Sequence, residues 1–395
     1  MTRLGIFTVK KICRFNGNYY TYGGFGDYLA AMRAAFPKVV LVAHLKESAP
    51  PEGYYLIPPG DDLEVAGLPQ VKTELGMLLI MPVIAWRCWL ATKKMDIAHA
   101  RMPNHTGVIG AFACDLRGVP VFCQIIADWY VEAQRMPCMR KYGLGLPLKL
   151  HLYLYDWLER LVCRGKLVFA QGQSCYEKHV GHSDCELVLS TAHYLHDIIP
   201  PRQRFVSKPY TILTVARLTG VKNQQLTIRA LAKLLAEGQE WRCVFVGDGP
   251  HKASLVQLAK ELNVESHVHF AGQAARGDAL WQYFDAADCF VLSSRSEGTP
   301  KVLLEAMARG LPIIATAVAG IPTSVKHEER GLLIEDNDVN GLVAAAKRLA
   351  GDPAFSYRLA QNASEFCKAH TVENATASML RKVVQKWPQF KDVKL

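Results

Sequence analysis

The chain has 395 residues, half of them apolar and about a fifth charged, which is the composition of a folded globular protein of two or three domains. Lysine and arginine number 46 and aspartate and glutamate 36, a formal net charge of +10. The excess is spread over both halves of the chain, which argues against a nucleic-acid-binding arm and favours phosphorylated small molecules or an anionic membrane surface as partners.

Short apolar runs alternate with amphipathic stretches throughout the first half of the chain. We predict strands over residues 4–9, 39–45, 96–100, 119–127 and 166–170. Strands that alternate with helices indicate βαβ units and a parallel sheet. The most apolar run, at 76–86, is too short to cross a bilayer, which requires about 20 residues.

Three positions in this half are candidates for a binding site. Gly23 and Gly24 open a predicted helix, where they either let the backbone approach a phosphate or an acceptor closely or form a flexible loop. Asp128 follows the strand at 119–127 and either holds a sugar hydroxyl or caps the next helix. His99 and Arg101 stand at the carboxyl end of another strand and are weaker candidates, since a lone histidine there is more often packed or solvated.

Residues 199–209 interrupt the pattern with three prolines and three basic residues, which is typical of a linker between domains. The alternation then restarts, with strands predicted over 210–216, 242–249, 267–272, 288–294, 311–318 and 331–335. The sequence therefore predicts two doubly wound, Rossmann-like α/β domains, over 1–200 and 201–375, with ligands bound in the cleft between them.

Two loops of the second half carry residues suited to a nucleotide. Arg217 and Lys222 follow the strand at 210–216, where two cations can stabilise the charge that builds on a leaving diphosphate without a metal ion. Solvated loop cations are the alternative. Gly247 and Gly249 form a G-x-G turn after the next strand, which is weak evidence for a nucleotide site and equally suits a tight turn between a strand and a helix.

The segment 293–322 carries the strongest signal. A polar turn leads to Thr299, a predicted N-cap, and Pro300, a predicted first helical residue, so that free N–H groups and the positive helix end make an anion site. Glu297 precedes this helix and Glu305 lies within it. Two carboxylates beside phosphate-binding amides suit a sugar nucleotide, since one can accept hydrogen bonds from the ribose and the other from the donor sugar.

The stretch EGTPKVLLEAMARGLPII resembles the E-x7-E signature of the retaining glycosyltransferases of the glycogen-synthase-like group, glycosyltransferase family four, which have the two-domain GT-B fold. The resemblance implies that Glu297 contacts the donor sugar and Glu305 the ribose. It also implies that Arg217 and Lys222, with amides near Gly298 and Thr299, hold the diphosphate.

The resemblance extends to weaker motifs. It implies that the backbone of Gly272 and Gln273 meets the base, that Gly247 lies beside the nucleotide, and that Gly23 and Gly24 form the N-terminal G-G turn. It further implies that residues 376–395 form a helix packed on the N-terminal domain.

One departure from the family pattern concerns the strand at 119–127. Many members of the family have a histidine at its end, where this chain has Ala127 followed by Asp128, so Asp128 is the candidate for the catalytic contact there.

We therefore predict a retaining, metal-independent hexosyltransferase that needs no cofactor. It would move a sugar from a UDP-sugar or GDP-sugar to a hydroxyl of a glycan or lipid-linked glycan, in lipopolysaccharide or exopolysaccharide biosynthesis. No metal site is expected, because the D-x-D at 336–338 lies where it would cap a helix. Two alternatives remain open: a GT-B sugar-nucleotide epimerase, or a non-catalytic sugar-nucleotide-binding partner of a synthase complex, which Ala127 suggests.

The cysteine usage and the basic residues bear on location. Eleven cysteines without C-x-x-C spacing give no zinc pattern and indicate buried thiols in a reducing compartment, and no secretory signal is evident, so we expect a cytoplasmic protein.

Residues 135–178 interleave basic and aromatic side chains. This segment either contacts an anionic membrane surface peripherally or forms a core-facing helix with a solvated basic side.

Overall fold

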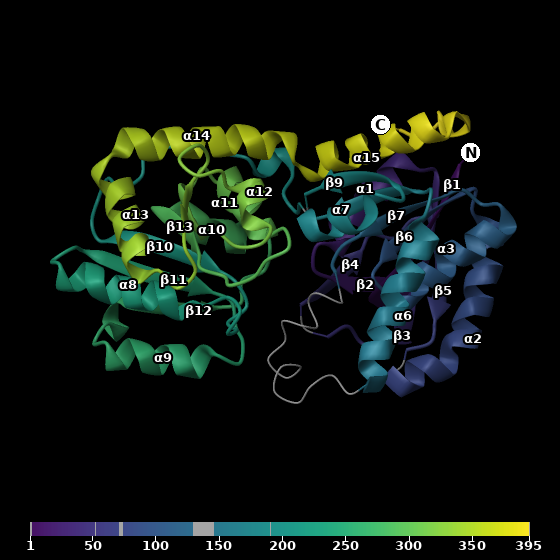
Figure 1. Cartoon of the computed structure of the whole chain (residues 1–395), viewed down its shortest axis with the longest axis horizontal. Helices are drawn as coiled ribbons and strands as arrows, with labels where there is room; N and C mark the ends of the chain where they lie inside the picture. Colours follow the sequence, from purple (N-terminus) through teal and green to yellow (C-terminus); the bar gives the residue numbers. More distant parts are fainter. Residues whose placement is uncertain (1, 52, 71–73, 129–145, 190, 395) are drawn as a thin grey trace. The chain divides into compact units, whose positions relative to one another are not determined.

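A computed structural model describes residues 2–51, 53–70, 74–128, 146–189 and 191–394 (Figure 1). The chain forms two compact units. The first comprises residues 1–189 and 373–395, and the second comprises residues 190–372.

The first unit is built on a mainly parallel sheet in the order β5-β3-β1-β6-β7-β8-β9. Its parallel strands are β1 (Arg3–Phe15), β3 (Lys38–Glu47), β5 (Leu63–Leu68), β6 (Ile97–Met102), β7 (Val121–Ile125), β8 (Leu167–Gln171) and β9 (Asp184–Val188). The far end of β1 continues beyond β6 and pairs antiparallel with β2 (Asn18–Tyr22), which in turn pairs with β4 (Tyr54–Ile57). The five strands predicted in this half are present, but β1 is longer than expected and the β2–β4 extension was not predicted.

Strand β1 contains a bulge in its pairing with β3. Phe7 stands opposite Val42 of β3, whereas Lys11 stands opposite His44, so three residues of β1 face a single residue of β3. Such a bulge bends a strand and re-aims its side chains. Lys10 lies in this bulge, just beyond the last pairing of β1 with β6, which joins Phe7 and Ala100.

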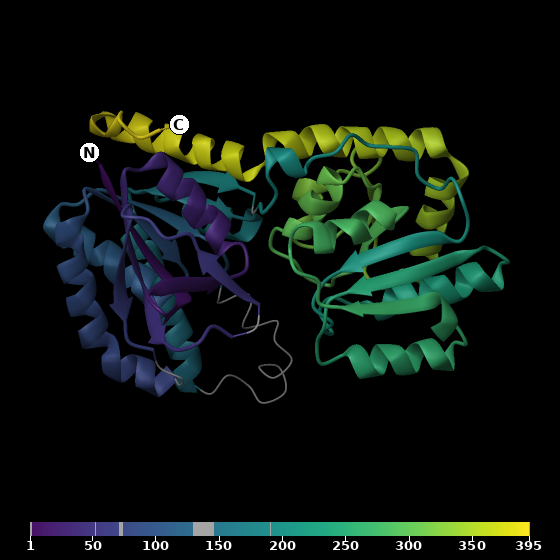
Figure 2. The same ribbon diagram turned by 180° about the vertical axis from the view of Figure 1, so that it is seen from behind.

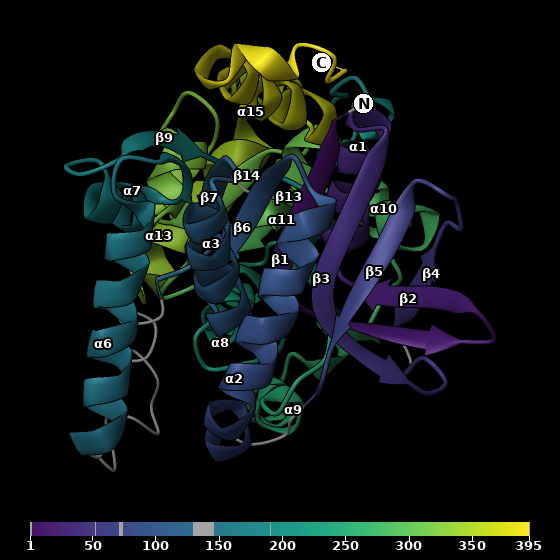
Figure 3. The ribbon, with the colours of Figure 1, turned by 90° about the vertical axis from the view of Figure 1, so that its right-hand side faces the viewer.

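Helices cover both faces of this sheet, because apolar side chains on each face must be removed from water. One face packs against α2 (Glu74–Ala91), α3 (His105–Arg117), α6 (Leu146–Cys163) and α7 (Gln173–His179), and Figure 3 shows α6, α3 and α2 side by side. The other face packs against α1 (Phe25–Ala35) and α15 (Val372–Lys386), seen in purple and yellow in Figure 2. Thr2 Oγ1 donates to Asp392 Oδ1 at 2.6 Å and joins the two chain ends.

The second unit has a fully parallel sheet in the order β12-β11-β10-β13-β14-β15. Its strands are β10 (Tyr210–Val215), β11 (Trp241–Val246), β12 (Val268–Gly272), β13 (Cys289–Leu292), β14 (Ile313–Thr316) and β15 (Leu332–Ile334). One face packs against α8 (Gln225–Ala236), α9 (Lys252–Glu261) and α13 (Val339–Gly351), and the other against α10 (Asp278–Ala286), α11 (Lys301–Ala308) and α12 (Ile321–Ser324). Helix α14 (Pro353–Ala369) contributes to both cores.

The predicted fold class of two doubly wound α/β domains is confirmed, since each sheet carries helices on both faces. None of the helices in the described ranges is long and apolar enough to cross a membrane. The described cysteines are all unpaired and, apart from Cys185, buried.

Candidate functional site

Most of the predicted site residues gather at one edge of the second unit's sheet. The carboxyl ends of parallel strands share an edge, and this is where open α/β sheets bind ligands. The residues that follow these strand ends are Arg217 and Lys222 after β10, Gly247 after β11, Gly272 and Gln273 at the end of β12, and Glu297, Gly298, Thr299, Pro300 and Glu305 after β13.

Lys222 and Glu297 form the central contact of this edge. Lys222 Nζ lies 2.5 Å from Glu297 Oε1, and Ser294 Oγ donates to the same oxygen at 2.5 Å. The Glu297 side chain is 9% exposed and that of Lys222 27%. An acid and a base that are 75 residues apart in the sequence thus meet at a partly open site.

The loop after β13 also fixes the position of the loop that carries Lys222. The Arg295 N–H donates to the Val221 carbonyl at 2.8 Å. Ser293 Oγ contacts the carbonyl oxygens of Lys222 at 3.2 Å and Asn223 at 3.0 Å. These contacts hold the backbone on both sides of Lys222. The Lys222 side chain therefore reaches Glu297 from a fixed position.

A third loop, after β14, supports the turn at Gly298. The Gly320 N–H donates to the Glu297 carbonyl at 3.1 Å, and Thr316 Oγ1 donates to the Ser294 carbonyl at 2.5 Å. A Cβ on Gly320 would lie 1.5 Å from the Gly298 carbonyl oxygen, so only glycine allows this approach. The sequence analysis missed Gly320 and Thr316, although a glycine a few residues after a strand end is a detectable signal.

Helix α11 begins one residue later than predicted. Lys301 is its first residue, and Pro300 is the N-cap with ψ 107°, an extended conformation, so the expectation that Thr299 caps the helix and Pro300 opens it is wrong. The φ of Pro300, −72°, would suit a helix, but its ψ does not, so the turn stays extended for one more residue. Glu305, in the middle of α11, is 9% exposed.

The glycine of the loop after β11 is required by close packing. Gly247 has φ +135°, and a Cβ there would lie 2.1 Å from the Ala216 carbonyl oxygen. Its N–H donates to the Gly272 carbonyl at 2.7 Å. Gly247 therefore lets the loops after β10, β11 and β12 meet, which is the tight-turn alternative of the sequence analysis. Arg217, in the first of these loops, is exposed, and its carbonyl accepts from Gln224 at 3.1 Å.

Gly23, Gly24 and Asp128 belong to the first unit, whereas the residues above belong to the second. Gly23 has φ +63° and its carbonyl accepts from the Tyr55 hydroxyl, while Gly24 is the N-cap of α1. Asp128 follows β7 and lies within electrostatic reach of Lys178. Burial lowers the pKa of Lys178, but the charges of nearby carboxylates, Asp128 among them, outweigh it and raise that pKa overall.

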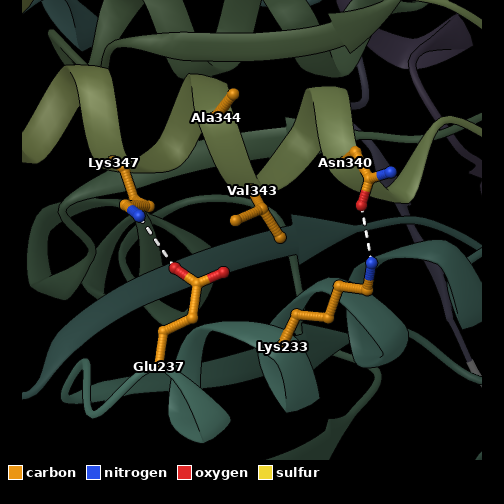
Figure 4. Close-up of a pocket in the computed structure, with 6 residues that line it drawn as sticks. All are labelled: Lys233, Glu237, Asn340, Val343, Ala344 and Lys347. Atoms are coloured by element: carbon orange, nitrogen blue, oxygen red, sulfur yellow. Dashed lines mark hydrogen bonds and ion pairs between the residues drawn. The ribbon is translucent and has the colours of Figure 1, made fainter.

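A groove of about 380 Å³ between α8 and α13 is lined by none of these residues (Figure 4). Its polar side chains are paired with one another, Lys347 with Glu237 at 2.8 Å and Lys233 with Asn340 at 2.6 Å. The groove is therefore not the candidate site. Within the described residues, no group of three histidine, cysteine or acidic side chains could hold a metal ion.

Residues 196–366 match the family model described as "Glycosyl transferases group 1". The N-acetyl-alpha-D-glucosaminyl L-malate synthase of Bacillus anthracis is 33% identical over 154 residues, which is 39% of each chain. The putative colanic acid biosynthesis glycosyltransferase WcaL of Escherichia coli is 35% identical over 154 residues, 38% of this chain and 36% of the relative. The chain spans about a quarter to a half of the length of the curated relatives it matches.

Solved structures extend the likeness to the whole chain. Anabaena Alr3699/HepE, crystallised with UDP, has a TM-score of 0.71 at 17% identity and is matched over 98% of this chain and 100% of its own. WaaG, a glycosyltransferase involved in lipopolysaccharide biosynthesis, has a TM-score of 0.64 at 17% identity, over 95% and 98% of the two chains. At this identity the likeness shows the fold, and it agrees with the predicted GT-B architecture.

Proposed function

We propose that the chain is a retaining, metal-independent glycosyltransferase. It moves a hexosyl group from a nucleoside diphosphate sugar to a hydroxyl of a glycan or lipid-linked glycan, in the assembly of a cell-surface polysaccharide. The observation that carries the proposal is the contact of Lys222 with Glu297 at the carboxyl edge of a sheet whose sequence matches group 1 glycosyltransferases. The relatives named for colanic acid and lipopolysaccharide synthesis support the polysaccharide context.

In this proposal the second unit binds the donor. Arg217 and Lys222, with backbone amides near Gly298, hold the diphosphate, and their positive charge stabilises the negative charge that builds on it as it leaves. Glu305 accepts from the ribose hydroxyls. Glu297 accepts from the hydroxyls of the donor sugar while it holds Lys222 in place, so one acid both positions the cation and contacts the sugar.

The retaining step needs no protein nucleophile. The bond from the anomeric carbon to the diphosphate oxygen breaks, and the acceptor oxygen bonds to the same carbon on the same face. The acceptor proton passes to a phosphate oxygen of the leaving group, as the resemblance to family four implies. Structures of Alr3699/HepE with UDP and with UDP-glucose support a UDP-sugar as the donor, and GDP-sugars are the second class to test.

Donor binding is the first experiment. Calorimetric titration of the full chain with UDP, GDP and ADP should identify one binding nucleotide, and that nucleotide at 100 times its Kd should stabilise the fold by about 2.7 kcal/mol. Lys222→Met should weaken binding about tenfold or more, because it removes a charge-assisted contact. Lys326→Met, at an exposed lysine paired with Glu329, is the matched control and should leave binding unchanged. Failure of all three nucleotides to bind contradicts the proposal.

Product analysis separates the proposal from its alternatives. A transferase consumes the donor sugar only when an acceptor is present, whereas an epimerase returns a rearranged sugar nucleotide without one. A chain that binds the nucleotide but turns over neither way, with any cell-surface glycan extract, would be the binding partner of a synthase.

We also place the protein in the cytoplasm at the inner membrane surface, where lipid-linked acceptors lie. The helices α2, α3 and α6 of the first unit carry large apolar side chains on their outer side, each more than half exposed: Leu79, Trp86, Phe112, Leu116, Tyr153 and Trp157. Figure 3 shows these three helices side by side. Monomeric proteins rarely leave so many large apolar groups in water without a partner.

A membrane is a better partner for this surface than the groove of another protein, because cations and tryptophans are interleaved on the surface. The Arg117 guanidinium lies 4.0 Å from the centre of the Trp89 ring, and the Arg160 side chain is half exposed on α6. Aromatic rings and cations favour the headgroup level of an anionic bilayer. Lys178, counted in the basic stretch 135–178, is instead buried against Asp156 and Glu159, and residues 135–145 lie outside the described residues.

Vesicle flotation tests this contact. The full chain should float with vesicles that contain phosphatidylglycerol at low salt, and less at high salt. Trp157→Ser should reduce flotation, whereas Val206→Ser, at a more exposed apolar position of the second unit, should not. Absence of flotation together with concentration-dependent dimerisation would assign the surface to a second copy of the chain.

A further inference from the structure

Two cations of the first unit, Lys10 of β1 and Arg101 of β6, lie beyond the last pairing of these two strands. Lys10 lies in the bulge of β1, and Arg101 is the fifth residue of β6. The charge of Arg101 contributes to the lowered pKa of Lys10, so Lys10 lies within electrostatic reach of Arg101. Without the bulge, the alternation of β1 would set a different side chain at this position. We call these residues the Lys10–Arg101 pair.

The Arg101 guanidinium is held against aromatic rings and by the Tyr28 hydroxyl rather than by a carboxylate. Its central carbon lies 4.0 Å from the centre of the Tyr28 ring and 5.4 Å from that of Phe25, both on α1. The Nη1 atom is buried and has no hydrogen-bond partner in the described part of the chain. Guanidinium groups form strong charge-assisted hydrogen bonds, so a buried donor without an acceptor is a costly feature that calls for a ligand.

Lys10 is likewise held by an aromatic ring, with Nζ 4.3 Å from the centre of the Tyr22 ring. Burial lowers the pKa of Lys10, and the nearby Arg101 charge lowers it further. Among the described residues, no carboxylate lies within ion-pair distance of either cation. Three other arginines of the same unit do pair with acids: Arg3 with Asp96, Arg14 with Glu47 and Arg33 with Asp62.

Two neighbouring cations that are partly removed from water and lack a counter-charge repel one another and lose hydration. A fold tolerates this when an anion completes the site. We propose that the Lys10–Arg101 pair binds an anionic oxygen group, a phosphate or a carboxylate, on the acceptor substrate. This inference rests on the proposed function, because it names the chemical class of the acceptor for that transferase.

The acceptor, rather than the donor, is assigned to this pair because the donor's diphosphate has its own cations. Arg217 and Lys222 belong to the second unit, where Glu297 already partners Lys222. The Lys10–Arg101 pair has no acid beside it, which suits a ligand that brings negative charge and few hydroxyl groups. The forked guanidinium can hold two oxygens at once and the ammonium a third, so a neutral acceptor would leave both cations uncompensated.

The test is a direct binding measurement on the full chain with the nucleotide site saturated by UDP. Titration calorimetry with inorganic phosphate and, separately, with malonate distinguishes a phosphate from a carboxylate ligand. Lys10→Gln should weaken binding of the preferred anion about tenfold or more, the loss of one charge-assisted contact. Lys11→Gln, the same charge change at the next and more exposed residue, should leave the affinity within about twofold.

Arg101→Gln should weaken binding of the preferred anion to a similar degree. If that variant does not fold, Lys10→Gln still decides, since Lys10 lies in a half-exposed bulge. Three results would overturn the proposal: neither anion binds, Lys10→Gln and Lys11→Gln bind equally well, or UDP displaces the anion so that both occupy one site. A chain that binds the anion but no nucleotide would refute the proposed function and leave the anion site standing.

Discussion

The contact between Lys222 and Glu297 predicts that substitutions of its two residues lower the stability of the fold by different amounts. Lys222→Met leaves the Glu297 carboxylate, 9% exposed, with the Ser294 hydroxyl as its remaining partner on the contacted oxygen. Breaking a fully buried ion pair costs about 3–5 kcal/mol, and because Lys222 is 27% exposed we take a lower value of about 2 kcal/mol. Glu297→Gln keeps an oxygen for Ser294 and frees a lysine that can turn to water, so it should cost about 1 kcal/mol or less.

Differential scanning calorimetry of the wild type, the two variants and the double variant measures this asymmetry. For a unit of residues 190–372, about 2 kcal/mol corresponds to a fall in Tm of roughly 4–8 °C. The double variant should lose less than the sum of the two single losses by about 1 kcal/mol, the coupling energy of the pair. Addition of the binding nucleotide identifies the transition of the second unit, because only that transition should rise.

The activity of the same variants separates structure from chemistry. Both single variants should lose transfer by about a hundredfold or more, because each removes a group placed against the leaving diphosphate or the sugar. Equal destabilisation by Lys222→Met and Glu297→Gln, or additive losses in the double variant, would refute the reasoning from burial. Full transfer activity of Glu297→Gln would refute its contact with the donor sugar.

Three further predictions concern other parts of the chain. Gly320→Ala should displace the Gly298 turn and cost about 1–3 kcal/mol with loss of nucleotide affinity, whereas Gly351→Ala, with open space around its Cβ, should be neutral in both calorimetry and titration. Asp338→Ala removes a side chain that accepts from the Gly341 N–H at 2.8 Å and should cost about 1 kcal/mol by denaturant titration, while calcium should not stabilise the wild type. Burial lowers the pKa of His44 and of His99, so below about pH 6.5 the unfolded chain binds protons that the folded chain does not bind. The contribution of each histidine to stability is therefore complete above about pH 6.5, and below it the free energy of unfolding should fall by up to about 1.4 kcal/mol per pH unit for each histidine. Urea titrations at several pH values measure this fall.

The second unit could be predicted closely because its architecture is local in sequence. Parallel strands buried on both faces appear as continuous apolar runs, and each of the six predicted runs is a strand. The loops that follow strand ends can then be placed at one edge, which predicts that Lys222 and Glu297 share one site, and in the structure they lie 2.5 Å apart. The positions of Arg217, Gln273 and Glu305 at that edge follow from the same rule, and their contacts with a donor stay predictions.

The first unit was harder because its informative features are not local. The bulge that contains Lys10 exists only in the pairing of β1 with β3, and no residue pattern in 4–15 indicates it. Helix α6 looks like a core helix in sequence, since periodicity reports an apolar stripe but not what covers it. The structure leaves Tyr153 and Trp157 of that stripe in solvent.

The two units differ in whether an acid neutralises the cations of the proposed site, and this difference links the donor and acceptor proposals. In the second unit Lys222 is neutralised by Glu297 before any ligand arrives, so a bare phosphate gains little there and a sugar diphosphate, which also satisfies the acid, gains more. In the first unit the Lys10–Arg101 pair has no acid, so a simple anion already completes it. Inorganic phosphate should therefore prefer the first unit and a sugar nucleotide the second, and raising the ionic strength should weaken the first interaction more steeply than the second because its attraction is uncompensated charge. On the two proposals, the donor site disfavours free phosphate and the first unit selects a negatively charged acceptor.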